Sequence, residues 1–135
     1  MERPIILIGG GGHCKSVIEA CRSCGRKVFG IMDIPEKIGQ FVLDVPIIAT
    51  EDDIPKYISD VEFLVTVGFI KDSTVRNRIY SNIIRNGGTM ATVIASSAHV
   101  SPYAEIGHGT VILQGACVNA ASKIGDNVII NTLSN

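Results

Sequence analysis

A six-residue repeat occupies the last forty residues of this chain and constrains the fold more than any other feature. Aliphatic residues recur at a spacing of six from residue 94 to residue 130. A small residue follows four positions later in each of the first five units. The aliphatic positions are Ile94, Val100, Ile106, Ile112, Val118, Ile124 and Ile130, and the small ones are Ala98, Ala104, Thr110, Ala116 and Ser122.

A period of six fits neither an α-helix nor an alternating strand, because their side-chain periods are 3.6 and 2. It is typical of a solenoid in which each hexapeptide supplies one short strand and one turn. Three hexapeptides close a triangular coil of 18 residues, so residues 94–135 hold about two coils. A coil stack this short has little core and an open apolar end, and we therefore expect the chain to associate with itself.

The first 93 residues follow a different pattern, in which strands and helices alternate. Continuous apolar runs predict buried strands, and helical patterns follow the first and third of them. Residues 34–45 are predicted to form a loop. The alternation favours an α/β fold with a parallel sheet and helices on both faces. The four predicted strands are Pro4–Ile8, Lys27–Met32, Phe63–Val67 and Met90–Ile94.

Four glycines, residues 9–12, stand between the first strand and the first helix, and His13 follows them. Glycines let the backbone approach a ligand closely, and a helix N-terminus presents free N–H groups. This combination favours phosphate binding. Asp33 closes the second strand, where doubly wound sheets often place a carboxylate that accepts hydrogen bonds from a ribose or a base.

Two alternatives to phosphate binding remain open for this turn. The dinucleotide fingerprint G-x-G-x-x-G is poorly matched, because its last glycine falls on Cys14 or Lys15. A nicotinamide-dependent protein is therefore a weaker hypothesis. The glycines could also serve only to make a tight turn, with His13 capping the helix.

The charge, the apolar runs and the cysteines argue against several other classes of protein. The net charge of −1 gives no electrostatic reason to expect nucleic acid as a partner. The apolar runs are too short to span a bilayer or to form a signal peptide, so we expect a cytoplasmic protein. Cys21 and Cys24 form a C-x-x-C inside a predicted helix, which favours packing thiols over a redox motif. No metal site is predicted.

Several segments occur together in an order that resembles a known family. They are GGGGHCKSVIEA from Gly9, VFGIMD from Val28, IGQFVLDVPIIATEDDI from Ile38 and the hexapeptides from Val100 onward. The chain resembles the sugar O- and N-acetyltransferases related to sialic acid O-acetyltransferase and to the bacterial UDP-4-amino-sugar N-acetyltransferase. The resemblance implies a Rossmann-like domain at 1–93, a left-handed parallel β-helix at 94–135, a homotrimer, and acetyl-CoA as the co-substrate.

The same resemblance implies a set of site residues. It places a nucleotide-sugar site, for a UDP-sugar or a related nucleotide sugar, on Gly9, Gly11, Gly12, His13, Asp33 and Gly68. Arg76 or Arg78 would reach a phosphate. Ile34 stands where the family often has a second acidic residue, and Cys14 stands where a small residue is usual. Both departures bear on which sugar the site would accept.

The family's catalytic base is a histidine that follows an Asn-Thr pair by a few residues. Asn131-Thr132 is present, and we expect the histidine beyond Asn135, so no residue of this chain is predicted to be catalytic. His108 is expected on a solvent-facing turn, with a surface or trimer-contact role. His99 falls at a position that the family motif does not assign.

Three functions therefore remain open. The first is an acetyltransferase of which this chain supplies only the sugar-binding part. The second is a non-catalytic module that binds a nucleotide sugar or regulates a full-length enzyme. The third is the nicotinamide-dependent protein.

Overall fold

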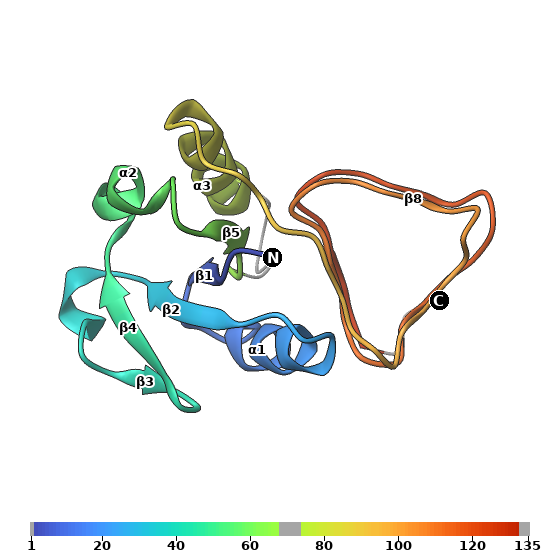
Figure 1. The fold of residues 1–135 in the computed structure, drawn as a ribbon, viewed down its shortest axis with the longest axis horizontal. Helices are drawn as coiled ribbons and strands as arrows, with labels where there is room; N and C mark the ends of the chain where they lie inside the picture. The colour runs from blue at the N-terminus through green and yellow to red at the C-terminus, as the bar shows by residue number, and fades with distance from the viewer. Residues whose placement is uncertain (1, 68–73, 133–135) are drawn as a thin grey trace.

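The computed structural model describes residues 2–67 and 74–132. They form two parts, an α/β sandwich and a triangular coil, which stand side by side (Figure 1). In the described segments no helix is long and apolar enough to cross a membrane.

A five-stranded sheet forms the centre of the first part, in the order β3-β4-β2-β1-β5. All neighbouring pairs are parallel except the β3–β4 hairpin. The predicted parallel sheet is confirmed. The strands are β1 (Ile5–Ile8), β2 (Val28–Met32), β3 (Phe41–Val42), β4 (Val45–Ala49) and β5 (Glu62–Val65).

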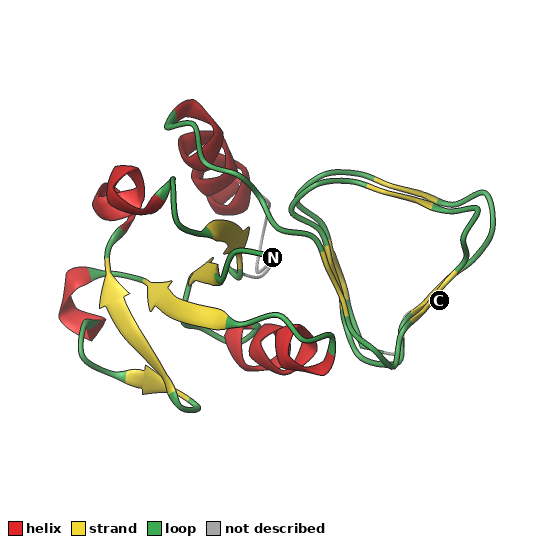
Figure 2. Ribbon diagram, viewed as in Figure 1, coloured by secondary structure: helices red, strands yellow, loops and turns green. Residues whose placement is uncertain are grey.

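Helices cover both faces of this sheet, as Figure 2 shows. Helix α1 (Cys14–Ser23) packs on one face, and α2 (Ile54–Tyr57) and α3 (Thr74–Arg85) pack on the other. Alternate residues of β1 belong to the two faces: Ile5 and Leu7 join the α1 cluster, whereas Ile6 and Ile8 join the α2–α3 cluster. This is the alternation that a strand buried on both sides requires.

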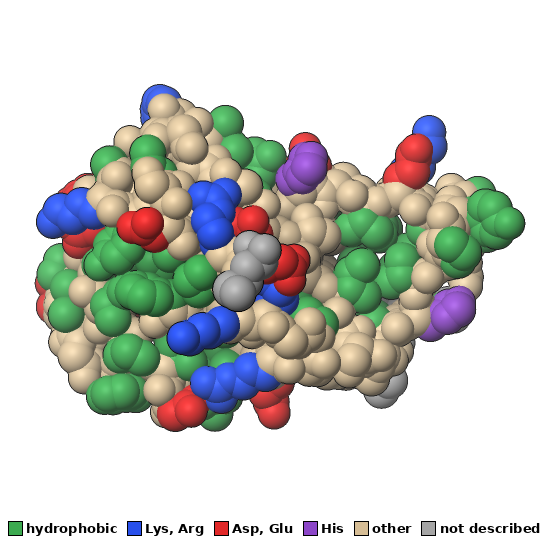
Figure 3. Space-filling view, viewed as in Figure 1, with side chains coloured by type: hydrophobic (Ala, Val, Ile, Leu, Met, Phe, Trp, Pro, Cys, Tyr) green, Lys and Arg blue, Asp and Glu red, His purple; other side chains and the backbone are tan. Residues whose placement is uncertain are grey.

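Residues 34–45 contain more structure than a loop. They hold a short 3-10 helix, η1 (Pro35–Lys37), and the edge strand β3. A second 3-10 helix, η2 (Glu51–Asp53), leads into α2 behind a capping box between Thr50 and Asp53. Exposed hydrophobic side chains gather over the β2–β4 side of the sheet, visible in Figure 3; they are Phe29, Ile34, Ile38, Phe41 and Leu43.

The second part is the parallel β-helix that the six-residue period predicts. Strands exactly 18 residues apart pair in parallel, for example Val93 with Val111 and Val111 with Ile129. Three hexapeptides therefore make one coil. The strands are β6 (Val93–Ile94), β7 (His99–Val100), β8 (Glu105–Ile106), β9 (Val111–Ile112), β10 (Cys117–Val118), β11 (Lys123–Ile124) and β12 (Ile129–Ile130).

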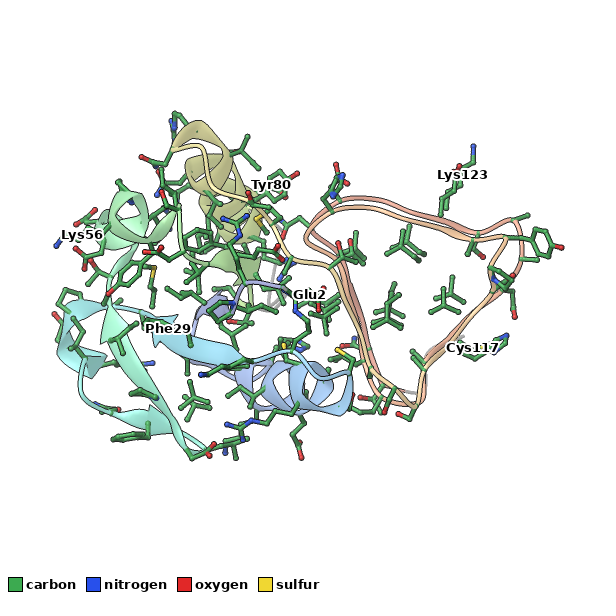
Figure 4. All side chains as sticks on the ribbon, in the orientation of Figure 1. Glu2, Phe29, Lys56, Tyr80, Cys117 and Lys123 are labelled. Atoms are coloured by element: carbon green, nitrogen blue, oxygen red, sulfur yellow. The ribbon has the colours of Figure 1, made fainter. Side chains whose placement is uncertain are left out.

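Aliphatic side chains fill the triangle, as Figure 4 shows. Ile112, Ala116 and Val118 are buried there, and the other repeat positions from Ala98 to Ile130 pack around them. The first aliphatic position, Ile94, remains 36% exposed at one end of the stack. At the other end a cavity of about 330 Å³ lies between the walls of the last coil, lined by residues such as Val118, Ile124 and Ile130.

One predicted strand is wrong. Met90–Ile94 was expected to complete the series of the α/β part, but only Met90 pairs there, in an isolated bridge with Phe63. Val93–Ile94 instead forms the first strand of the β-helix, on β9. An apolar run of five residues cannot say which sheet it joins, because either sheet would bury it.

The β-helix docks on the α/β part through a strip that the sequence analysis overlooked. Val93, Val111 and Ile129 precede inward-facing positions and so point out of the triangle. All three are buried in the same cluster as α1. The equivalent positions of the other strands are His99, Glu105, Cys117 and Lys123, none of which is fully buried. The sequence signal for the docked face is an apolar residue just before the inward-facing one, which occurs only in every third hexapeptide.

Candidate functional site

The glycine-rich turn lies at the C-terminal edge of the sheet, between β1 and α1. Gly9 has a φ of +117°, and a Cβ atom there would lie 2.6 Å from Cγ2 of Val67 and 3.0 Å from its backbone nitrogen. Only glycine fits this approach to the end of β5. Cβ atoms at Gly11 and Gly12 would meet nothing within 4 Å, so this part of the turn faces open space.

Asp33 follows β2 and fixes the glycine-rich turn from the other side. Its Oδ2 accepts a hydrogen bond from the N–H of Gly10 at 2.8 Å, and its Oδ1 accepts one from the N–H of Ile34 at 2.7 Å. The Lys37 ammonium lies 3.8 Å from Oδ2. A carboxylate has about four acceptor positions, so these contacts leave room for a hydroxyl of a ligand.

A cavity of about 340 Å³ opens where these strand ends meet. Gly9, Asp33, Thr50 and Val67, which follow β1, β2, β4 and β5, all line it. Helix α1 follows β1 on one face of the sheet and α3 follows β5 on the other, so the cavity lies at the point where the connections diverge. Open parallel sheets bind ligands at this place.

The rim of the cavity on the α3 side carries an ion pair. Arg78 donates from Nη1 and Nη2 to the two carboxylate oxygens of Glu51, at 3.1 and 3.0 Å. Asn82 Nδ2 adds a contact to Glu51 at 3.3 Å. The glutamate raises the pKa of the Arg78 guanidinium. Arg78 is more than half exposed, so its guanidinium is accessible at this rim.

The predicted site residues are not all brought together. Gly9 and Asp33 line the cavity, whereas Gly11, Gly12 and His13 lie outside its lining, on the exposed part of the turn. His13 occupies the N-cap position of α1, but its side chain makes no capping hydrogen bond. Gly68 lies outside the described residues.

Arg76 does not have the expected role. Its side chain is 1% exposed, and it points into the molecule. Nη1 donates to the carbonyl oxygens of Val65 and Val67 at 3.0 and 2.7 Å, and Nη2 donates to the backbone and side-chain oxygens of Asn127 at 2.9 and 2.8 Å. Arg78 lines the cavity and Arg76 does not, so of the two arginines only Arg78 remains a candidate for a phosphate contact.

Burial divides the four free cysteines into two groups. Cys14 and Cys21 are buried, and burial raises the pKa of their thiols to about 11 and about 12. Cys24 is exposed beyond the end of α1, and Cys117 is half-buried on β10. The expectation of a packing thiol fits Cys21, but Cys24 packs little and donates only a weak hydrogen bond to the carbonyl of Cys21 at 3.4 Å.

Thiol titration checks this division. At pH 8 the folded chain should react rapidly with an aromatic disulfide through Cys24 and Cys117, and the other two thiols should react only after unfolding. A thiol with a pKa of about 11 in place of 9.0 has about 100-fold less thiolate, and burial also blocks access. Four fast thiols in the folded chain would contradict the packing of α1 described above.

The histidines of the β-helix stand on its surface, as Figure 3 shows for this part of the molecule. His99 and His108 are both exposed. The expected solvent-facing turn is confirmed for His108: its N–H donates to Asp126 Oδ1 at 2.8 Å, and its carbonyl accepts from Asn127 N–H at 2.8 Å. The described residues contain no group of three or more potential metal ligands.

An α/β sheet with a cavity at its switch point, followed by hexapeptide coils, is the architecture that the hexapeptide-repeat sugar acetyltransferases share. Residues 4–83 match the model of the PglD N-terminal domain. The chain belongs to this family of sugar N-acetyltransferases.

Solved structures agree with this assignment. Perosamine N-acetyltransferase from Caulobacter crescentus, in complex with CoA and GDP-perosamine, is 34% identical with a TM-score of 0.86. The match covers 96% of this chain and 60% of that one. The acetyltransferase domain of PglB from Neisseria gonorrhoeae FA1090, in complex with acetyl coenzyme A, is 30% identical with a TM-score of 0.85, over 98% of this chain and 63% of that one.

An uncharacterized protein of Acanthamoeba polyphaga mimivirus is 34% identical over 126 residues, which are 93% of this chain and 24% of that protein. The chain thus spans less than two thirds of the length of each of these relatives.

Proposed function

We propose that this chain binds a nucleotide-activated amino sugar in the cavity at the C-terminal edge of the sheet. The observation that supports this most is the hydrogen bond from Gly10 to Asp33, because it holds the open glycine-rich turn next to a carboxylate that lines the cavity. The relative from Caulobacter crescentus was solved with GDP-perosamine, which is a ligand of this kind.

Each part of the site has a proposed role. The open turn at Gly11 and Gly12 and the N-terminus of α1 would hold the diphosphate, because backbone N–H groups and the positive end of the helix dipole favour anions. The free acceptor positions of Asp33 would bind ribose hydroxyls. Arg78 would add a positive charge from the opposite rim.

The reaction of the lineage is acetyl transfer from acetyl-CoA to an amino or hydroxyl group of the sugar. The acceptor attacks the thioester carbonyl, a base takes its proton, and the CoA thiolate leaves. None of the described histidines lies at the cavity. We therefore propose that this chain by itself binds the nucleotide sugar without completing the transfer. A non-catalytic binding or regulatory module remains the second candidate, because it needs the same cavity and no base.

Assembly and location stay predictions from the sequence. The homotrimer is implied by the family resemblance alone, and the exposed Ile94 is an apolar side chain that association could cover. A cytoplasmic location is expected only from the sequence, whose apolar runs are short.

A thermal-shift titration tests the proposed function. UDP, GDP, CMP-sialic acid, NADH and acetyl-CoA are added separately to the chain. A ligand that binds only the folded state raises the midpoint by mass action. Stabilisation by UDP or GDP, without an effect of NADH, supports the proposal. A response to NADH alone would favour a nicotinamide-dependent protein, and no response to any nucleotide would refute the site.

Replacing Asp33 with alanine should weaken binding of the responding nucleotide by at least about tenfold, because a charge-assisted hydrogen bond to the ligand and the anchor of Gly10 are both lost. Asp33→Asn, which keeps an acceptor oxygen, should lose less. Isothermal titration calorimetry measures both. Asp44→Ala is the matched control, since this aspartate lies on the β3–β4 turn, paired only with exposed Arg22. Equal affinity of Asp33→Ala and the unmodified chain would contradict the assignment.

A further inference from the structure

Arg76 joins the two parts of the molecule at one point. It is the third residue of α3, and its guanidinium donates to Val65 at the end of β5, to Val67 just after it, and to the turn before β12. Asn127 in that turn is held in the left-handed region, with a φ of +57°. Its Nδ2 donates back to the carbonyl of Arg76 at 3.4 Å, so three hydrogen bonds connect these two residues.

A second polar contact connects the coil to the other helix beside the cavity. Gln114 Nε2 donates to the carbonyl of Ser16 at 3.2 Å, and Ser16 is the third residue of α1. The coil is thus attached to the first turns of both α1 and α3. These are the two helix ends that flank the proposed nucleotide site, and Val67, whose carbonyl Arg76 binds, lines the cavity.

We infer that Arg76 is a positioning residue: it holds the end of β5, at the nucleotide cavity, in a fixed relation to the β-helix. The inference rests on the proposed function, because Arg76 would fix the position of a nucleotide bound at the sheet relative to the coils beyond it. Acetyl transfer needs donor and acceptor held in a precise relative position, so in an enzyme that completes the transfer a rigid link between the two parts would contribute to the rate.

Burial and charge support this role over simple space filling. The guanidinium is planar and its N–H donors point in fixed directions. Its two terminal nitrogens can therefore donate hydrogen bonds to both parts of the molecule in a single orientation. Burial lowers the pKa of Arg76 to about 10, which leaves it charged at neutral pH and keeps every donor in place. A flexible apolar side chain would fill the same volume without fixing an angle.

Hydrogen exchange with and without nucleotide tests the link. UDP or GDP, whichever binds, is expected to slow exchange of the coil amides between residues 107 and 130 by about threefold or more, although none of them lines the cavity. Asn127→Gly suits the left-handed backbone and removes two of the three hydrogen bonds to Arg76. In this variant the slowing should remain around Gly9 and Asp33 and disappear from the coil.

Two control variants accompany this experiment. Asn127→Asp keeps an oxygen acceptor for Arg76 and tolerates the same backbone, so it should retain the slowing in the coil. Lys123→Ala breaks only an exposed ion pair with Glu105, 3.9 Å long, on the outer face of the coil, where Lys123 points into solvent (Figure 4). It should behave as the unmodified chain. Equal slowing of the coil in Asn127→Gly would overturn the positioning role, as would no slowing in the unmodified chain when nucleotide binds.

A measurement without nucleotide separates this inference from the proposed function. Spin labels on the accessible thiols Cys24 and Cys117 report the distance between the two parts, with labelled chain diluted in unlabelled chain to suppress contacts between copies. The distance distribution should be narrow in the unmodified chain and at least about twofold broader in Asn127→Gly. An unchanged width would refute the link even if nucleotide binds. Broadening without any nucleotide binding would refute the proposed function alone.

Discussion

Replacing Arg76 with alanine is expected to lower the free energy of unfolding by about 3–5 kcal/mol. The substitution leaves the carbonyl oxygens of Val65 and Val67 and the side chain of Asn127 without their buried donor. It also opens a cavity the size of an arginine side chain, because Arg76 is among the largest fully buried residues. A loss of this size is a large fraction of the stability of a small domain.

Denaturant unfolding followed by circular dichroism measures this loss, and thermal melting should show a midpoint lower by about 10 °C or more. Arg78→Ala is the matched control, two residues along the same helix. Its side chain is 57% exposed and its ion pair with Glu51 is at the surface, so its removal should cost less than about 1 kcal/mol. If the two variants have the same stability, Arg76 is not the buried link described above.

The second large effect is expected at Gly107, in the turn after β8. A Cβ atom at this position would lie 2.5 Å from the carbonyl carbon and oxygen of Gly125, and it would also collide with Asp126 Oδ1. Gly125 is the equivalent residue one coil further, so the collision is between stacked backbones and no side-chain rotation relieves it. Gly107→Ala should therefore destabilise the chain by about 3 kcal/mol, at the upper end of the usual cost of overpacking.

Gly125→Ala is an unusually close control, because it is the same substitution 18 residues later at the same place in the coil. A Cβ atom at Gly125 would meet nothing within 4 Å. This variant should lose less than about 1 kcal/mol, the ordinary backbone cost of the change. Unfolding in urea compares the two. Similar losses would mean that the two coils do not stack in the register of β8 on β11.

Much of the fold was predictable because its signals are local. The six-residue period fixed the 18-residue coil, and the continuous apolar runs identified β1, β2 and β5. The capping box between Thr50 and Asp53 is a local signal of the same kind, because it needs only four consecutive residues. Gly25, with a φ of +79°, lies just past the end of α1, where a glycine commonly ends a helix.

The candidate site was predictable only in part. A strand, a glycine run and a helix predict where phosphate can bind, and Asp33 follows from its place at the end of β2. The hydrogen bond from Gly10 to Asp33 joins residues 23 positions apart, and the distance between them in space cannot be read from the sequence. The choice between Arg76 and Arg78 stayed open for a similar reason. They are two residues apart on one helix and therefore face opposite directions, one into the molecule and one to the rim.

The sequence by itself determined β1, β2 and β5, the coil period and the family, because each depends on spacing along the chain. Only the tertiary structure decided that Val93–Ile94 belongs to the β-helix, that Val93, Val111 and Ile129 form its docked face, and that Arg76 connects the two parts. These facts depend on which surfaces meet in space. An apolar or charged side chain gains the same free energy from any partner of the right shape and chemistry. Its position in the sequence therefore does not determine which partner it contacts.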